Sequence, residues 1–215
     1  MDPTRFRCLD APNEPVLGWF KSRALRKRLR SIEPTRLGEL AEDAIGRIYA
    51  TVRTRNDQLL TAPISHRACV YYAVGIYDGG HMIGGAQQGV SFVLEEEGTS
   101  AHAIVDLDHA LVSVGYDHTT TCRGPFDADP DQKTLLVALD LIGRSWFQTD
   151  QVVFLEGTIE PGDRITLLGS GIREADPDGG FEGIYRDGGR TRLVLRGSRE
   201  HPLVLSDDQA LHVSW

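Results

Sequence analysis

The chain has 215 residues, 40% of them hydrophobic and 25% charged, an ordinary composition for a globular protein that buries a sizeable core. Cys8, Cys69 and Cys122 are odd in number and widely spaced, which argues against a disulfide framework or a CxxC metal pair and favours a reducing cytoplasm. No apolar run approaches the roughly 18 residues of a membrane helix, and the N-terminus lacks the apolar stretch of a signal peptide, so we expect a cytoplasmic protein.

The net charge of −8 is unevenly distributed. Residues 1–36 carry nine Lys and Arg against four Asp and Glu, a net charge of +5, which leaves −13 for residues 37–215. Nucleic-acid affinity rests on neutralising phosphates with Lys and Arg. The acidic body is therefore an unfavourable surface for nucleic acid, and we expect two regions, an N-terminal segment 1–36 and a domain 37–215.

The first predicted element, the basic helix, covers residues 19–32. Trp19, Leu25, Leu29 and Ile32 share one face at helical spacing, and Glu33-Pro34 ends the pattern. The opposite face carries only cations, namely Lys21, Arg23, Arg26, Lys27, Arg28 and Arg30. Such a helix either packs its apolar stripe on the body or contacts an anionic membrane or acidic partner. Contact residues in the second case are Trp19, Lys21, Arg26, Lys27 and Arg30.

The rest of the chain alternates short β-rich segments with turn signals. Residues 37–44 form a short helical turn or lead directly into a strand. The pattern predicts strands at 45–53, 68–77, 90–94, 102–107, 152–159, 164–173, 190–196 and 203–205. Residues 78–89 hold five glycines and are predicted to form a flexible hairpin loop. Residues 115–133 are polar and are predicted to form a surface loop, and 133–147 has a helical repeat. Short strands at spacings near ten residues indicate a mostly β barrel or sandwich with one inserted helix.

Four segments form an ordered pattern. They read IYATV at 48–52, LLTAPISHRACVYY at 59–72, FVLEEEGT at 92–99 with AIVD at 103–106, and LEGTIEPGDRITLLG at 155–169. Over residues 37–206 this resembles the GIDE domain, also called BAM ("beside a membrane"), which occurs in the mitochondrial ubiquitin ligase MULAN and in many bacterial proteins. The TAPIS-x3-CVYY part is the more specific, because EPGDRITLLG is found in many small barrels.

The resemblance implies an OB-like β-barrel that acts as a recognition or docking module. The chain departs from the family because the flanking membrane helices are absent. A RING needs eight zinc ligands at tight spacing, which three scattered cysteines cannot supply. Ubiquitin-ligase activity is therefore not carried over.

Candidate ligand-binding residues lie around the second strand. His66 and Arg67, on the loop that enters it, could contact an anionic ligand, although an ordinary solvated loop is the simpler interpretation. Tyr71 and Tyr72 point to opposite faces, because side chains alternate along a strand. We expect one of them in the core and the other at the surface, where it could stack on a ligand.

Catalytic and metal-binding interpretations are weaker. Cys69 is expected to be a small buried hydrophobe, because it lies in an apolar strand. His118 and Cys122 lack the further ligands that zinc requires. Asp127, Asp129 and Asp131 resemble a calcium loop but lack its glycine and its final Glu. No nucleophile elbow or phosphate-binding loop is present, so we predict no catalytic residues, metal or cofactor.

The sequence thus predicts a non-enzymatic module that binds a protein or small ligand through barrel loops, within a bacterial multi-component system. The alternative is a peripheral membrane adaptor held by helix 19–32 at the inner face of the membrane. A third interpretation, a hydrolase that uses His118 or His102, would need a deep polar pocket around those histidines.

Overall fold

The computed structural model describes residues 7–8, 25, 27–124, 126–142, 151–175 and 191–211. The chain divides into two compact units, each assembled from three separate stretches. Unit 1 comprises Met1–Ser22, Gln58–Val90 and Val114–Glu160, and unit 2 comprises Arg23–Asp57, Ser91–Ser113 and Pro161–Trp215. The domain boundary expected after residue 36 falls inside unit 2.

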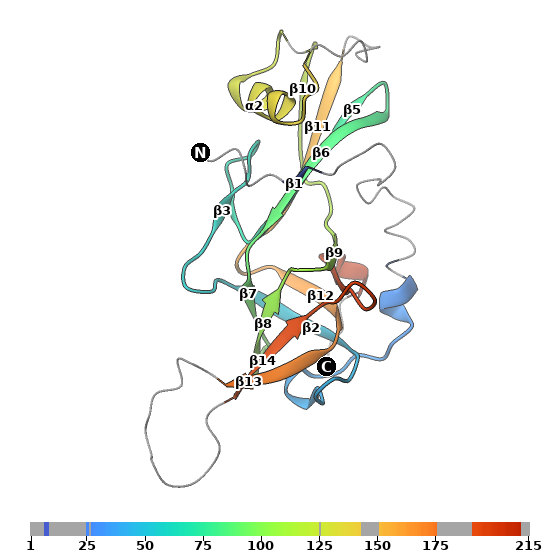
Figure 1. The fold of residues 1–215 in the computed structure, drawn as a ribbon, viewed down its shortest axis with the longest axis vertical. Coiled ribbons are helices and arrows are strands. Elements are labelled where there is room, and N and C mark those ends of the chain that lie inside the picture. Colours follow the sequence, from blue (N-terminus) through green and yellow to red (C-terminus); the bar gives the residue numbers. More distant parts are fainter. Residues whose placement is uncertain are drawn as a thin grey trace. The chain divides into compact units, whose positions relative to one another are not determined.

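Unit 1 is built on a five-stranded antiparallel sheet (Figure 1). In spatial order its strands are β1 (Arg7–Cys8), β6 (His81–Gly89), β5 (Tyr71–Asp78), β11 (Val152–Ile159) and β10 (His118–Cys122). A two-stranded ribbon pairs β3 (Leu60–Thr61) with β4 (Ala68–Cys69). The helix α2 (Pro130–Ala138) buries Leu135 and Leu136 in a core shared with the sheet.

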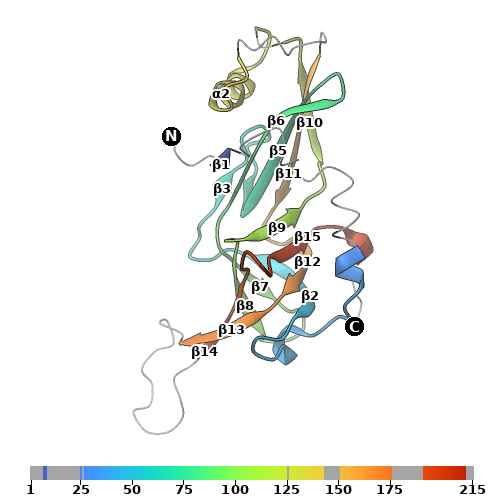
Figure 2. The ribbon, with the colours of Figure 1, turned by 45° about the vertical axis from the view of Figure 1, so that its right-hand side comes forward.

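Unit 2 contains an eight-stranded sheet with antiparallel and parallel pairs (Figure 2). Its strands, in spatial order, are β13 (Gly171–Ala175), β14 (Thr191–Arg196), β8 (His102–Asp106), β7 (Phe92–Glu95), β2 (Gly46–Arg53), β12 (Arg164–Gly169), β15 (Leu203–Ser206) and β9 (Ala110–Ser113). Two short 3-10 helices, η2 (Leu37–Glu39) and η3 (Gln209–Leu211), belong to the same unit. In β2, alternate residues from Gly46 to Val52 are buried, which leaves one face of this strand more open.

All eight predicted strand segments contain strands in the structure, although 68–77 divides into β4 and β5 at Val70 and 164–173 divides into β12 and β13 at Ser170. The helical turn at residues 37–44 is the 3-10 helix η2. The mostly β prediction is therefore confirmed. The predicted barrel is not seen, because in the described residues the end strands β13 and β9 of the larger sheet are not paired with each other.

Two segments predicted as loops contain strands, although the predicted hairpin at 78–89 is present. Residues 78–89 form a tight hairpin, in which Gly79 and Gly80 (φ 57° and 82°) make the turn and β6 follows at once. Glycines in β6 allow close packing, since a Cβ on Gly84 would lie 2.8 Å from Leu141 Cδ1. Within 115–133, the β-branched run Thr119–Thr121 forms β10.

The inserted helix is shorter than its apolar repeat predicted. It begins at Pro130, three residues before the predicted start, because Asp129 caps it. Its last helical residue is Ala138, and Asp140, with φ 52°, is incompatible with a continued helix. The predicted continuation to residue 147 lies partly outside the described residues.

Candidate functional site

The loop Thr61–Arg67 of unit 1 contains the two predicted anion-binding residues and is closed by its own backbone. The amide of Ala62 donates to the carbonyl of Arg67 at 2.9 Å, and the amide of His66 donates to the carbonyl of Ala62 at 3.0 Å. His66 adopts φ 58°, a left-handed conformation that an L-residue adopts only when its surroundings impose it. The loop is thus a defined structure.

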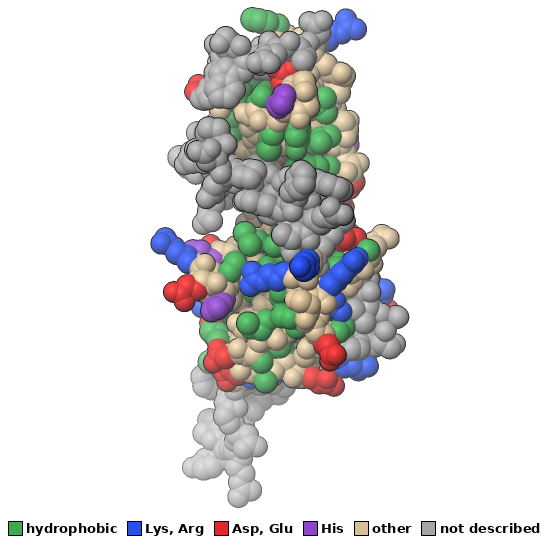
Figure 3. Space-filling view, turned by 90° about the vertical axis from the view of Figure 1, so that its right-hand side faces the viewer, with side chains coloured by type: hydrophobic (Ala, Val, Ile, Leu, Met, Phe, Trp, Pro, Cys, Tyr) green, Lys and Arg blue, Asp and Glu red, His purple; other side chains and the backbone are tan. Residues whose placement is uncertain are grey.

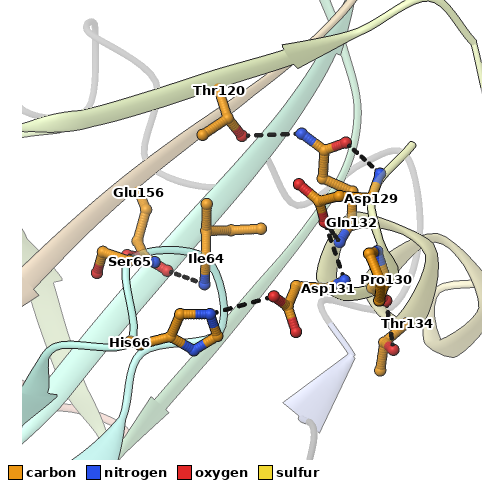
Figure 4. Close-up of polar contacts among 10 residues, drawn as sticks. All are labelled: Ile64, Ser65, His66, Thr120, Asp129, Pro130, Asp131, Gln132, Thr134 and Glu156. Carbon is orange, nitrogen blue, oxygen red and sulfur yellow. Dashed lines mark hydrogen bonds and ion pairs between the residues drawn. The ribbon is translucent and has the colours of Figure 1, made fainter. Parts of the chain in front are cut away.

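Glu156 of β11 is the residue that holds this loop. Its side chain is fully buried, and its carboxyl oxygens accept hydrogen bonds from the amides of Ile64 at 2.8 Å and Ser65 at 3.0 Å (Figure 4). A buried carboxyl group is costly unless hydrogen bonds compensate its lost hydration. The two amides supply this compensation, and in return they fix the loop against the sheet.

Arg67 is engaged by acidic partners of the same unit. Its two terminal nitrogens form a bidentate pair with Asp117, at 2.6 Å each, and Nη1 also lies 3.0 Å from Glu160. Its Nε donates to Ser65 Oγ at 3.1 Å, so every guanidinium nitrogen has a partner. An anionic ligand would have to displace these carboxylates. Arg67 therefore serves to hold the structure together and is not an open site for an anion.

His66 reaches toward the start of α2 (Figure 4). Its Nε2 lies 3.1 Å from Asp131 Oδ2, with side chains 62% and 48% exposed. The neighbouring Asp129 accepts hydrogen bonds from the amides of Asp131 and Gln132, while the Gln132 side chain accepts from the Asp129 amide. This capping box explains Asp129 without calcium.

Tyr71 and Tyr72 do not form the expected platform. They are 5% and 2% exposed, and their hydroxyls donate to Gln87 and Gln88 of β6 at 2.9 and 3.0 Å. The expectation that one of them lies at the surface was wrong, because β5 is an interior strand with both faces covered. Neither ring is free to stack on a ligand.

The described thiols are buried. Cys69 is fully buried, as expected, and burial followed by the nearby Glu156 and Glu160 raises its pKa to about 12. Burial and then Asp127 and Asp129 raise the pKa of Cys122. A nucleophilic cysteine needs the opposite shift.

These thiols are therefore expected to resist alkylation. At pH 8 the thiolate of Cys69 is about 1,000-fold rarer than that of a thiol with the reference pKa of 9.0. Iodoacetamide should label Cys69 at least about 100-fold more slowly in the folded protein than in urea, measured by peptide mass mapping, which reports each cysteine separately. Labelling within ten-fold of the unfolded rate would contradict this assignment.

His118 and Cys122 do not share a metal site. Both lie in β10, not in a helix, so a spacing of four residues separates them by about 13 Å along the strand. Among the described residues, no three His, Cys, Asp or Glu side chains are grouped to hold a metal ion. His102 lies in the other unit, on β8, and its Nδ1 is 3.2 Å from the carbonyl of Ser100.

The basic helix is described in part. Leu25 and Lys27–Arg30 are helical, whereas Ser31 and Ile32, the last residues of the predicted helix, are not. Of the apolar stripe, Leu25 and Leu29 are buried, at 7% and 0% exposed, and Ile32 is half-buried. Lys27, Arg28 and Arg30 are exposed. Several Lys and Arg side chains gather on the face of the molecule that Figure 3 draws. Trp19, Lys21 and Arg26 lie outside the described residues. Of the helices described, none has the length and apolar character needed to cross a bilayer.

The Arg67–Asp117 pair should make stability depend on pH. The hydrogen bond from Arg67 holds the pKa of Asp117 below its reference value of 3.8, so the pair stabilises the fold above about pH 4. This contribution is lost as the pH falls through the lowered pKa. Because Asp117 is half exposed, Asp117→Asn should cost at most about 1 kcal/mol at pH 7.

Urea unfolding at pH 7 and pH 3 measures this effect. The difference between wild type and Asp117→Asn should shrink at pH 3. The control is Asp57→Asn, at an exposed turn residue with φ 52° that asparagine also tolerates. A difference that stays constant with pH would refute the role of Asp117.

Two residues of this site were missed from the sequence, Asp117 and Glu156, and Asp131 was considered only as part of a calcium loop. Glu156 offered a signal, since it is the only charged residue in the otherwise apolar or neutral segment Val152–Ile159. Asp117 offered none, because a polar residue in a polar stretch is the default expectation. None of the family models, curated proteins and solved structures compared with this chain matches it.

Proposed function

We propose that this chain is a non-enzymatic recognition module that binds a protein partner through the loop Thr61–Arg67. The observation that carries the proposal is the loop's fixation by the buried Glu156. A loop that is already ordered loses little entropy when it binds, and preorganisation of this kind raises affinity. The burial of Cys69 and Cys122 supports a binding function over nucleophilic catalysis.

The GIDE-like assignment and an OB-like barrel remain part of this proposal. They rest on the TAPIS-x3-CVYY segment, which forms the loop, β4 and the start of β5. Under the GIDE-like assignment, the partner belongs to a bacterial multi-component system. The exposed polar side chains of His66 and Asp131 make a polar partner surface the best match.

A matched pair of histidine variants tests the loop. His66 and His109 both have φ 58° and both are exposed, but they belong to different units. Glycine suits this φ, so His66→Gly and His109→Gly should both fold with a stability within about 1 kcal/mol of wild type.

Photo-crosslinkers placed at position 66 or 109, in an extract of the source organism, identify the partner. We expect a specific adduct from position 66 alone, and capture of the same partner by wild type and His109→Gly but not by His66→Gly. Equal capture by all three proteins would reject the loop as the docking surface.

The second candidate function is a peripheral membrane adaptor, favoured by the exposed Lys27, Arg28 and Arg30. Since Leu25 and Leu29 are buried, the described residues would bind by charge, at about 1 kcal/mol per cation near an anionic surface. Co-sedimentation with phosphatidylserine vesicles should then fall with added salt and disappear when all three residues are changed to Glu. Absence of salt-dependent binding by the wild type would exclude this function.

A further inference from the structure

Unit 2 carries a polar cavity of about 400 Å³ that the proposed function does not use. Its walls include two arginines, Arg53 and Arg164, and three consecutive glutamates, Glu95–Glu97. Strand pairing brings them together, because Thr51 of β2 lies opposite both Arg164 of β12 and Glu95 of β7. The volume is within the range of small-molecule binding sites.

The two outer glutamates have cationic partners inside the cavity. Arg53 Nε donates to Glu95 Oε2 at 2.6 Å, and Arg164 Nη2 forms an ion pair with Glu97. The Arg164 guanidinium also lies 5.9 Å from the centre of the Tyr49 ring, which helps to fix its position. Both arginines are therefore paired, and Glu96, the middle glutamate, has no cationic partner among the described residues.

Glu96 is 5% exposed, and in the described part of the chain its carboxyl group has one hydrogen bond, a long one of 3.4 Å from Thr99 Oγ1. Both residues line the cavity, so this bond lies at its wall. The turn around it is ordered, since the Glu96 amide donates to the Ala101 carbonyl at 3.0 Å and the Ala101 amide to Thr99 Oγ1 at 3.1 Å. The carboxyl oxygen of Glu96 that has no hydrogen bond among the described residues is not sealed from solvent, so it can accept from a ligand in the cavity that Glu96 lines.

We propose that this cavity binds an organic cation, an alkylguanidinium or alkylammonium group, with Glu96 as its main acceptor. The lining charges, two positive and three negative, favour a single positive charge. No three metal-ligating side chains are grouped in the described residues, which favours an organic cation over a metal ion. The group can belong to a free small molecule or to an arginine or lysine of a partner, and these share the same recognition chemistry.

Binding of butylguanidinium, measured by calorimetry and by amide chemical shifts of the labelled full chain, tests the site. Its neutral isostere butylurea is the ligand control. We expect butylguanidinium to shift the amides of Glu95–Thr99 and butylurea to leave them unchanged. A short acetylated peptide with one central arginine distinguishes the two sources: tighter binding than butylguanidinium indicates a partner side chain, and weaker binding indicates a free cation.

Glu96→Gln retains the shape of the side chain and should weaken binding about ten-fold or more. Glu200→Gln changes the net charge equally at an exposed site of the same unit and should bind like wild type. If Glu96→Gln does not fold, the amide chemical shifts of the wild-type protein with butylguanidinium and butylurea still test the proposal. The proposal is overturned if butylguanidinium and butylurea shift the same amides, if neither shifts Glu95–Thr99, or if Glu96→Gln binds equally well.

This site is independent of the loop Thr61–Arg67. The cation titration and the His66→Gly comparison address different units, so failure of one leaves the other proposal standing.

Discussion

Glu156→Ala is expected to lower the free energy of unfolding by about 3 kcal/mol, because it leaves two amides without an acceptor. Each unsatisfied buried donor costs about 1–3 kcal/mol, and part of this is recovered because a buried carboxyl group is also removed. Against a total stability of about 5–15 kcal/mol this is a large loss. Urea unfolding gives the free energy, and hydrogen exchange reports on the loop.

The exchange experiment is the more specific of the two. The amides of Ile64 and Ser65, which donate to Glu156, should be protected in the wild type and exchange rapidly in the variant. Glu200→Ala, at an exposed position, should change stability by no more than about 0.5 kcal/mol. Unchanged protection of Ile64 and Ser65 in Glu156→Ala would mean that the carboxyl group does not hold the loop.

Gly157→Ala is expected to destabilise unit 1 by about 3 kcal/mol or more. An added Cβ would meet the carbonyl oxygen of Gly115 and lie 3.1 Å from its carbonyl carbon, and both are backbone atoms that cannot rotate away. Overpacking that moves the backbone costs about 1–3 kcal/mol and sometimes more. The strand β11 pairs with β5 at this point, opposite Ala73, so the shift would spread into the centre of the sheet.

Gly38→Ala is the matched control, because its added Cβ would make an ordinary 3.5 Å contact with Ala101 Cβ. Where the backbone permits, a Gly→Ala change stabilises by about 0.4–1 kcal/mol through the unfolded chain. Thermal and urea unfolding should therefore move the two variants in opposite directions. If Gly157→Ala is as stable as wild type, the Val114–Gly115 backbone can move away from the added Cβ at little cost in free energy.

The alternation of apolar and polar residues predicted most strands, because the burial of one face of a strand imposes this alternation on the local sequence. Residues 152–159 were identified to the residue as β11, and 45–53 matched β2 within one residue. The hairpin strand β6 was missed because glycines, usually turn residues, are used in it for close packing. Such packing depends on Leu141, which is far away in the chain.

The candidate site was less predictable than the fold. His66 and Arg67 were identified from the sequence, but their partners Asp131 and Asp117 lie about 50–65 residues further along the chain. Tyr71 and Tyr72 were misjudged because alternation assigns side chains to opposite faces without saying which faces are covered. Only the order of strands in the sheet, with β5 between β6 and β11, gives that information.

The interleaving of the two units has a consequence for synthesis of the protein on the ribosome. In the eight-stranded sheet β2 pairs with β12, matching Thr51 with Arg164, so the sheet cannot be completed until residues 164–169 have emerged. The sheet of unit 1 is complete once β11 ends at Ile159. During translation, β2 and β8 therefore wait with unpaired edges until β12 and β14 are made, and nascent chains stalled before residue 164 should be the most prone to aggregate.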